Sequence, residues 1–214
     1  MNVIKVILVV VFLNLCACYG YASSRIKLNF DFDWKFSLTD HPGYAAIDYS
    51  DANWEQVQLP HDWNIKQKFD RKGIGSAAYL PEGIGWYRKT FFVPQSYKGR
   101  TVSILFDGIF QQSDVYINGK HLGHRPYGFC SIEYDLTPYL HTGKENVIAV
   151  RVNTTGGRPR WYAGAGIYRH VWLTAANPVH VATYGTYITT PEATEDHADV
   201  KIVTTVSNQS DKEQ

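Results

Sequence analysis

Arginine and aromatic side chains gather among glycines in residues 156–173, GGRPRWYAGAGIYRHVWL. Guanidinium groups donate hydrogen bonds to sugar hydroxyls, carboxylates or phosphates, and flat aromatic rings stack on the apolar face of a pyranose. The segment is therefore a candidate phosphate cradle, a candidate sugar-binding surface, or only a tight turn. The candidate binding residues are Arg158, Arg160, Trp161 and Tyr162.

A phosphate cradle needs glycines at set spacings followed by a helix, whose N-terminal amides meet the phosphate. Gly164-Ala-Gly166 lacks the third glycine, and HVWL at 170–173 predicts a strand instead of a helix. A loop between strands that carries arginines and aromatic rings favours a carbohydrate ligand. The alternative is that Trp161 and Tyr162 anchor the core and the glycines only permit the turn.

Other polar pairs give weaker signals. His121 and His124, in HLGH, are three positions apart, which places them on opposite faces of a strand, so we expect surface histidines and no metal site. His61 and Asp62, in LPHDW, lack a serine elbow, and we expect structural residues at an edge. No pair of carboxylates stands out, so we assign no catalytic residue, and we expect no cofactor.

Composition excludes one large class of function. Lysine and arginine total 21 against 20 aspartate and glutamate, a formal net charge of +1. Without a broad positive field, binding to nucleic acid is disfavoured. The aromatic content of 14% suits sheet packing or a surface for flat ligands.

Residues 1–22 have the pattern of an export signal, with Lys5 before an apolar run that is too short for a permanent membrane anchor. Ordinary signal peptidase could cleave before Ser23, or Cys18 could be the lipidated first residue of a lipoprotein. Either route predicts a periplasmic or lipid-anchored location in a bacterial cell envelope. The mature chain then keeps only Cys130, which rules out an internal disulfide, and we expect a buried small hydrophobe there.

After the leader the pattern predicts an almost entirely β fold. In 146–153, Ile148, Val150 and Val152 share one face, as a sandwich strand requires. Asn118-Gly119 predicts a two-residue hairpin turn, and 136–141 predicts a short helix. Further strands are predicted at 101–109, 113–119, 129–136 and 170–175, and two more after Pro178. We expect domains at 23–176 and 177–214, the second of them incomplete.

Several segments together resemble the sugar-binding N-terminal domain of glycoside hydrolase family 2, the β-galactosidase and β-glucuronidase family, particularly its Bacteroidetes-type members. They include FDFDWKF, NWEQVQLPHDW, GIGWYRKTF, LFDGIFQQSDVYINGKHLGHRPYGF, YDLTPYLHTGKENVIAVRV and RWYAGAGIYRHVWL. The resemblance implies a jelly-roll-like, galactose-binding-domain-like β-sandwich followed by the first strands of an immunoglobulin-like sandwich.

The resemblance also implies that the catalytic glutamates lie on a TIM-barrel domain supplied by a longer or separate chain, so this chain alone is expected to be inactive. It implies that the 156–173 loop helps to bind the terminal sugar. Better-known members carry an acidic residue near Arg160, and this departure puts galactose specificity in doubt. The guanidinium favours an acidic or sulfated glycan, or pairs with a barrel carboxylate.

Two other functions remain open. One is an autonomous carbohydrate-binding protein whose aromatic surface combines Trp161 and Tyr162 with Trp63 or Trp86. The other is an unstable structural remnant with unpaired strand edges.

Overall fold

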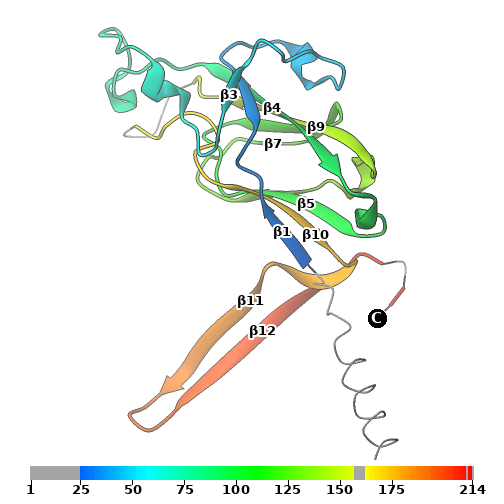
Figure 1. Cartoon of the computed structure of the whole chain (residues 1–214). Helices are drawn as coiled ribbons and strands as arrows, with labels where there is room; N and C mark the ends of the chain where they lie inside the picture. Colours follow the sequence, from blue (N-terminus) through cyan, green and yellow to red (C-terminus); the bar gives the residue numbers. More distant parts are fainter. Residues whose placement is uncertain (1–24, 157–161, 211, 214) are drawn as a thin grey trace, which may run out of the picture.

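The computed structural model describes residues 25–156, 162–210 and 212–213. Its strands form two facing sheets and a separate hairpin that projects from one end of the sandwich (Figure 1). The strands are β1 (Arg25–Asn29), β2 (Trp34–Ser37), β3 (Glu55–Val57), β4 (Ile84–Val93), β5 (Thr101–Phe106), β6 (Ser113–Ile117), β7 (Lys120–Arg125), β8 (Ile132–Asp135), β9 (Lys144–Asn153), β10 (Val171–Ala176), β11 (Val179–Ala193) and β12 (Ala198–Asn208). Short 3-10 turns are η1 (Pro42–Ala45), η2 (Trp63–Lys66), η3 (Gly75–Ala77), η4 (Gln95–Tyr97) and η5 (Thr137–Tyr139).

The strand pairs are antiparallel throughout these sheets. One sheet has six strands in the order β3-β2-β4-β9-β6-β7, and the other has four in the order β1-β10-β5-β8. Sequence neighbours are often far apart in this order, so most pairings join distant parts of the chain. The all-β prediction is confirmed.

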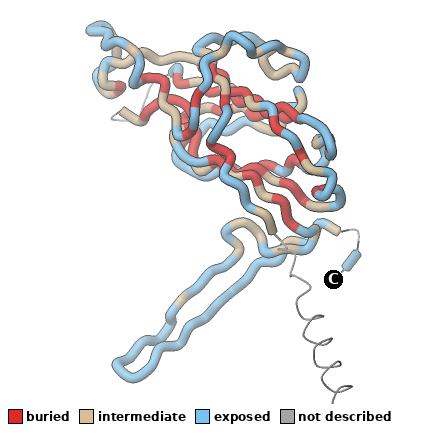
Figure 2. The backbone as a smooth tube through the Cα atoms, viewed as in Figure 1, coloured by how far each residue is buried: buried red, intermediate tan, exposed pale blue. Residues whose placement is uncertain are grey.

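The core lies between the two sheets, where Figure 2 shows the buried residues concentrated. Ile148, Val150 and Val152 are fully buried in it, which confirms the face predicted for this strand. The opposite face of β9 is also buried at Val147 and Ala149, because η1 and its flanking residues cover that side of the sheet.

Arg88, on β4, holds this covering segment in place. It is 1% exposed, and its guanidinium donates to the carbonyl oxygens of Tyr44, Ala46 and Tyr49. Its Nε also lies 3.1 Å from the carboxylate of Asp51. Burial alone would raise the pKa of Asp51, but hydrogen bonds from Lys35 and Arg88 outweigh it and lower the pKa.

The predicted turns have two outcomes. Asn118 and Gly119 have φ of 49° and 79° and join Ile117 to Lys120, which confirms the two-residue hairpin. The predicted helix at 136–141 is only the single 3-10 turn η5, since Pro138 lies within it and no longer helical pattern follows.

The expectation of a buried Cys130 was wrong, since its side chain is exposed. The strand predicted from Phe129 begins only at Ile132. Cys130 therefore lies in the loop before β8, where Phe129 is 48% exposed as well.

Strands β11 and β12 confirm the two strands predicted after Pro178. They pair with one another, and most of their residues are exposed (Figures 1 and 2).

Among the described residues, no helix has the length and hydropathy needed to cross a bilayer.

Replacing Arg88 tests the attachment of the covering segment. Arg88→Ala should lower the free energy of unfolding by about 3 kcal/mol or more, because it leaves Asp51 and three carbonyls without their buried donor. Urea unfolding measures the change, with the exposed Lys120→Ala as control. A loss no larger than that of the control would contradict this role.

Candidate functional site

The candidate site is the connection between β9 and β10, which carries the predicted sugar-binding residues. Tyr162 is the predicted site residue that the structure describes, whereas Arg158, Arg160 and Trp161 lie outside the described residues. Tyr162 is half-buried, and its hydroxyl donates to the Asp62 carboxylate. It is therefore neither a free surface ring nor a fully buried anchor.

Asp62 organises the described part of this loop. Its Oδ1 accepts hydrogen bonds from the backbone N–H of Ala165 at 3.0 Å and of Asn64 at 2.9 Å. The second bond caps the N-terminus of η2, as an aspartate at this position favours. One carboxylate thus joins η2, Tyr162 and Ala165, although the chain separates them by about a hundred residues.

Backbone hydrogen bonds fix the same loop from two sides. The N–H of His61 donates to the Ile167 carbonyl at 2.8 Å, and the N–H of Trp63 donates to the Ala165 carbonyl at 3.1 Å. On the other side, Gly166 and Phe110 exchange two bonds of 2.8 and 3.0 Å. The loop is therefore clamped between LPHDW and the segment after β5.

Gly166 is required by this close approach. Its φ is 119°, and a Cβ at this position would lie 2.8 Å from the His61 carbonyl oxygen. Gly164 also has a positive φ of 82°. Both glycines thus have backbone angles that the turn requires, and the Tyr162 hydroxyl contacts Asp62.

The other end of the loop is held by β4 and its preceding segment. Thr154 donates its N–H to the Gly83 carbonyl at 2.9 Å and accepts the Gly83 N–H on its hydroxyl. The next contact is from the Gly156 N–H to the Glu82 carboxylate at 3.2 Å. In sequence, Arg158 and Arg160 thus lie between two residues that each contact a carboxylate.

Buried polar atoms lie beside this loop. His61 contacts the Tyr87 hydroxyl through Nδ1 at 2.8 Å, but its Nε2 is buried without a hydrogen-bond partner among the described residues. The side-chain Oδ1 and Nδ2 atoms of the fully buried Asn64 also lack a hydrogen-bond partner among the described residues. Buried polar atoms without hydrogen bonds are rare in proteins, because each loses its hydrogen bonds to water and gains none in return. Sequence reasoning placed His61 and Asp62 only at an edge and missed their contact with the loop.

Trp63 and Trp86 do not form the proposed aromatic surface. They are 2% and 1% exposed, because Trp63 stacks on Phe36 and Trp86 packs beneath Tyr116. This expectation was wrong, since both rings are used for sheet packing.

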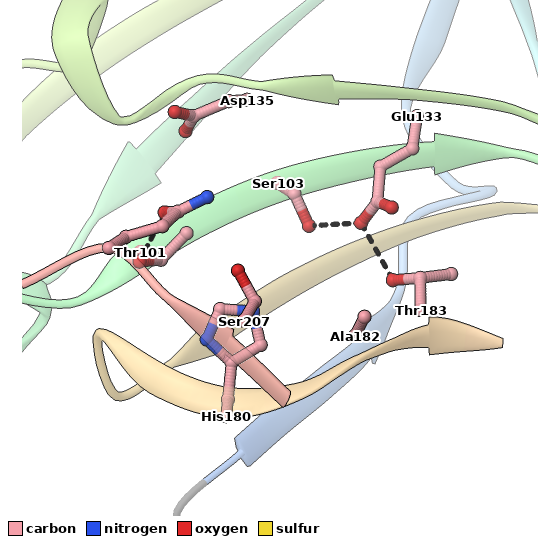
Figure 3. Close-up of a pocket in the computed structure, with 9 residues that line it drawn as sticks. Thr101, Ser103, Glu133, Asp135, His180, Ala182, Thr183 and Ser207 are labelled. Carbon is pink, nitrogen blue, oxygen red and sulfur yellow. Dashed lines mark hydrogen bonds between the residues drawn. The ribbon is translucent and has the colours of Figure 1, made fainter. Parts of the chain in front are cut away.

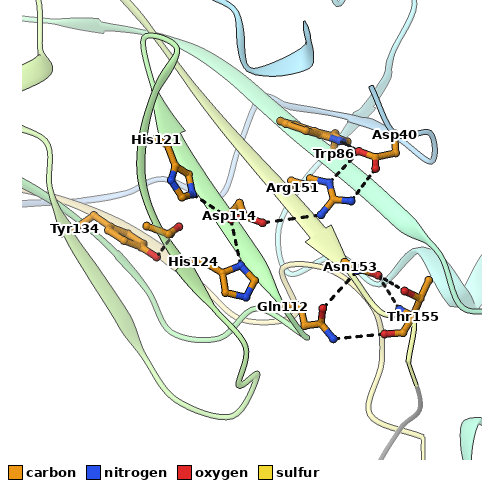
Figure 4. A network of polar contacts seen from close by, with 11 residues as sticks. Asp40, Trp86, Gln112, Asp114, His121, His124, Tyr134, Arg151, Asn153 and Thr155 are labelled. Atoms are coloured by element: carbon orange, nitrogen blue, oxygen red, sulfur yellow. Dashed lines mark hydrogen bonds and ion pairs between the residues drawn. The ribbon is translucent and has the colours of Figure 1, made fainter. Parts of the chain in front are cut away.

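His121 and His124 were expected on opposite faces of a strand, and this was wrong. A bulge in β7 at Leu122, opposite the step from Val115 to Tyr116, places both imidazoles on the same side. Each contacts Asp114 Oδ1, at 3.0 and 3.1 Å, beside the Asp40–Arg151 ion pair (Figure 4). Both histidines are exposed, as expected. Nowhere in the described residues are three His, Cys, Asp or Glu side chains arranged to hold a metal ion.

A polar hollow of about 250 Å³ lies between the four-stranded sheet and the hairpin (Figure 3). Glu133 accepts hydrogen bonds from Ser103 at 2.7 Å and from Thr183 at 2.9 Å. Thr101 donates to Gln209 at 2.8 Å. These bonds attach the hairpin to β5 and β8, so we interpret the hollow as the junction between the hairpin and the four-stranded sheet.

Comparison with known proteins shows similarity between this chain and glycosidases. A family model described as the sugar binding domain of glycosyl hydrolases family 2 matches residues 27–177. The chain is 45% identical to the β-galactosidase BoGH2A of Bacteroides ovatus over 203 residues, which are 93% of this chain and 24% of that protein. It is 41% identical to a putative β-glucuronidase of Formosa agariphila, across 88% of this chain and 18% of the relative.

Solved structures agree with these relatives. A crystal structure of a β-glycosidase from Bacteroides vulgatus matches with a TM-score of 0.82 and 39% identity, across 87% of this chain and 25% of that one. The chain spans a quarter or less of the length of these relatives.

Asp62→Ala tests the organisation of the loop. It should lower the free energy of unfolding by about 2 kcal/mol or more, since it removes the η2 cap and the contacts with Ala165 and Tyr162. Tyr162→Phe, which removes one of these bonds, should cost about 1 kcal/mol. If urea unfolding gives equal losses for the two variants, Asp62 does not hold the loop.

His61 predicts a dependence of stability on pH. Burial, with the positive charge of Lys66 adding to it, lowers the pKa of His61 in the folded chain. As pH falls below about 6.5, the unfolded chain binds a proton that the folded chain does not, so the free energy of unfolding decreases.

The matched variant is His61→Gln, which cannot titrate. Between pH 7.5 and pH 5.5, the free energy of unfolding measured in urea should decrease more for the native chain than for the variant. Equal losses would mean that His61 binds its proton equally well in both states.

Proposed function

The chain belongs to glycosyl hydrolases family 2 through its sugar binding domain, and we propose that it is the carbohydrate-binding N-terminal module of an exported family 2 glycosidase. In this proposal the 154–168 loop helps to form the sugar pocket. The catalytic glutamates belong to a barrel domain in a longer or separate chain, and this module does not catalyse hydrolysis by itself.

The observation that carries the proposal is the clamped loop between β9 and β10. Asp62 and Gly166 fix its C-terminal part, and Glu82 contacts its N-terminal part. A loop held at both ends by a rigid sandwich can present side chains to a ligand at low entropic cost. Within the described part of the chain, His61 Nε2 and the side-chain amide of Asn64 are buried without hydrogen-bond partners, which supports a site that a second body completes.

The sugar class follows from the residues on this loop. The relatives carry the names β-galactosidase and β-glucuronidase. We propose that Arg158 and Arg160 recognise an acidic or sulfated sugar and that Trp161 stacks on its ring, with Tyr162 beside them. Pairing of Arg160 with a carboxylate of the barrel is the alternative that the kinetic test below separates.

The hairpin supports a larger protein around this module. Val181, Ile188, Ile202 and Val206 lie on one face of it and are each at least 39% exposed. An apolar sheet face of this kind is stable when a second sheet covers it. We propose that residues 177–214 belong to an immunoglobulin-like sandwich whose other strands lie elsewhere in the enzyme.

Location is part of the same proposal. Residues 1–22 have the sequence of an export signal, with processing before Ser23 or lipidation at Cys18. The module would then work in the periplasm or anchored to the cell envelope.

The proposal predicts kinetic defects from changes in the loop. In an enzyme reconstituted with the catalytic part of a family 2 glycosidase, Arg160→Ala or Trp161→Ala should lower kcat/KM about tenfold or more, since one polar or stacking contact contributes on the order of 1 to 3 kcal/mol. Lys98→Ala, an exposed change outside the loop, is the control.

Unchanged kinetics in both variants would assign these residues to the scaffold. If Arg160 instead pairs with a carboxylate of the barrel, Arg160→Ala should lower kcat/KM equally for acidic and for neutral substrates. For the isolated module, a change in tryptophan fluorescence with millimolar sugar would favour autonomous binding.

A further inference from the structure

The hairpin of β11 and β12 meets the sandwich at a short connection. It forms a two-stranded sheet of its own, separate from the four-stranded and six-stranded sheets. Asn177 and Pro178 separate the end of β10 at Ala176 from the start of β11 at Val179. Rotations between packed bodies are usually absorbed by a few residues at the ends of elements. The connection at 177–178 is therefore a candidate hinge.

Side-chain hydrogen bonds hold the hairpin at both edges of the four-stranded sheet, which are β1 and β8. At the β1 edge, the Arg25 guanidinium donates to a backbone carbonyl of β11. At the β8 edge, the Thr183 hydroxyl of β11 donates to Glu133 at 2.9 Å (Figure 3). Between them, Thr101 of β5 donates to Gln209 at 2.8 Å. The direction of the hairpin is thus fixed at three points across the sheet.

Glu133 is the strongest acceptor at the β8 edge. Its Oε1 also accepts the Ser103 hydroxyl at 2.7 Å, so the sandwich orients the carboxylate that Thr183 contacts (Figure 3). Carboxylate acceptors make stronger hydrogen bonds than neutral ones. The neighbouring contact between the Ser131 and Tyr184 hydroxyls measures 3.5 Å, which is the outer limit of a hydrogen bond.

The hollow beside Glu133 gives the hairpin room to move. Its volume is about 250 Å³, and its lining is mostly polar, with Asp135, His180 and Ser207 among its residues (Figure 3). Opening an apolar junction would expose apolar surface to water, which is unfavourable in proportion to its area. A polar lining instead exchanges its hydrogen bonds for bonds to water at a small net cost. This side of the junction can therefore open while the core of the sandwich stays closed.

We propose that the junction is a hinge and that the bond between Glu133 and Thr183 keeps it closed. When this bond breaks, the hairpin turns about residues 177–178 while Arg25 keeps the β1 edge attached. Glu133 is a positioning residue, since it sets the direction of the hairpin through Thr183.

The hinge is a property of this chain and goes beyond the proposed function. One consequence rests on that function. If the hairpin opens the next domain of a family 2 enzyme, Glu133 sets the orientation of the sandwich relative to that domain.

The test is the orientation of the hairpin in the whole chain, measured by NMR. Residual dipolar couplings of backbone amides report whether β11 and β12 align as one body with β4 and β9. Relaxation dispersion reports the population of a minor open state that exchanges in microseconds to milliseconds. In the native chain, we expect hairpin couplings that fit the alignment of the sandwich, with a minor open state.

Removal of either partner of the bond should favour the open state. Glu133→Ala and Thr183→Val should each raise the ratio of open to closed state at least about fivefold, because each removes the same hydrogen bond. The double variant should have no larger effect than a single one, since the bond is lost only once. Glu133→Gln keeps a side-chain oxygen that can accept the Thr183 hydroxyl, so it should raise the ratio less than Glu133→Ala.

Two matched controls lie outside the bond. Asp135→Asn changes a carboxylate two residues further along β8 that lines the same hollow but accepts the Thr137 N–H at 2.9 Å within the sandwich. Thr186→Val repeats the threonine substitution at an exposed position of β11. Both controls should leave the ratio unchanged. Native amide chemical shifts in β4 and β9 show that the sandwich of each variant is folded.

Three results would overturn the proposal. Hairpin couplings of the native chain that do not fit the alignment of the sandwich would mean that the junction is not held closed. An unchanged ratio in Glu133→Ala and Thr183→Val would mean that their bond does not control it. Effects that add in the double variant would mean that the two residues act independently. None of these results bears on the kinetics of the Arg160 and Trp161 variants, so the two proposals fail independently.

Discussion

The hydrogen bonds of Asp62 determine how this domain holds the loop between β9 and β10. A half-buried carboxylate caps η2, accepts the Ala165 N–H and contacts the Tyr162 hydroxyl. Bonds from two backbone N–H groups and one hydroxyl compensate the carboxylate for its lost hydration. Because these donors come from segments far apart in the chain, the loop takes this shape only when the whole sandwich has folded.

The sandwich provides the rigid frame that this arrangement needs. The core between the sheets fixes β9 and β10, and the LPHDW segment reaches the loop because Leu59 and Trp63 are buried in that core. On the outer face, Arg88 binds the covering segment to β4. The same frame leaves most of the hairpin exposed, so this surface is available for contact with another domain.

Local patterns predicted the fold well. Alternation in 146–153 and the Asn118-Gly119 pair depend on residues that are neighbours in sequence, and both expectations were confirmed. The resemblance of several segments to family 2 was likewise confirmed by the family match. Sequence patterns fail where one inserted residue or a distant partner decides the outcome. The bulge at Leu122 turned His121 and His124 to the same side, and nothing in HLGH indicates it.

The site was predictable only in part, for the same physical reason. Glycines and aromatics marked the loop, but the carboxylate that holds it is about a hundred residues away, and LPHDW by itself has no catalytic or metal-binding pattern. The most direct measurement is amide hydrogen exchange of Ala165 and Gly166 by NMR in the native chain. If the contacts within this domain hold the loop, the amide protons of Ala165 and Gly166 should exchange as slowly as those of β9 and β10. Exchange as fast as in an unstructured peptide would contradict the account, because the contacts within this domain would then not hold the loop.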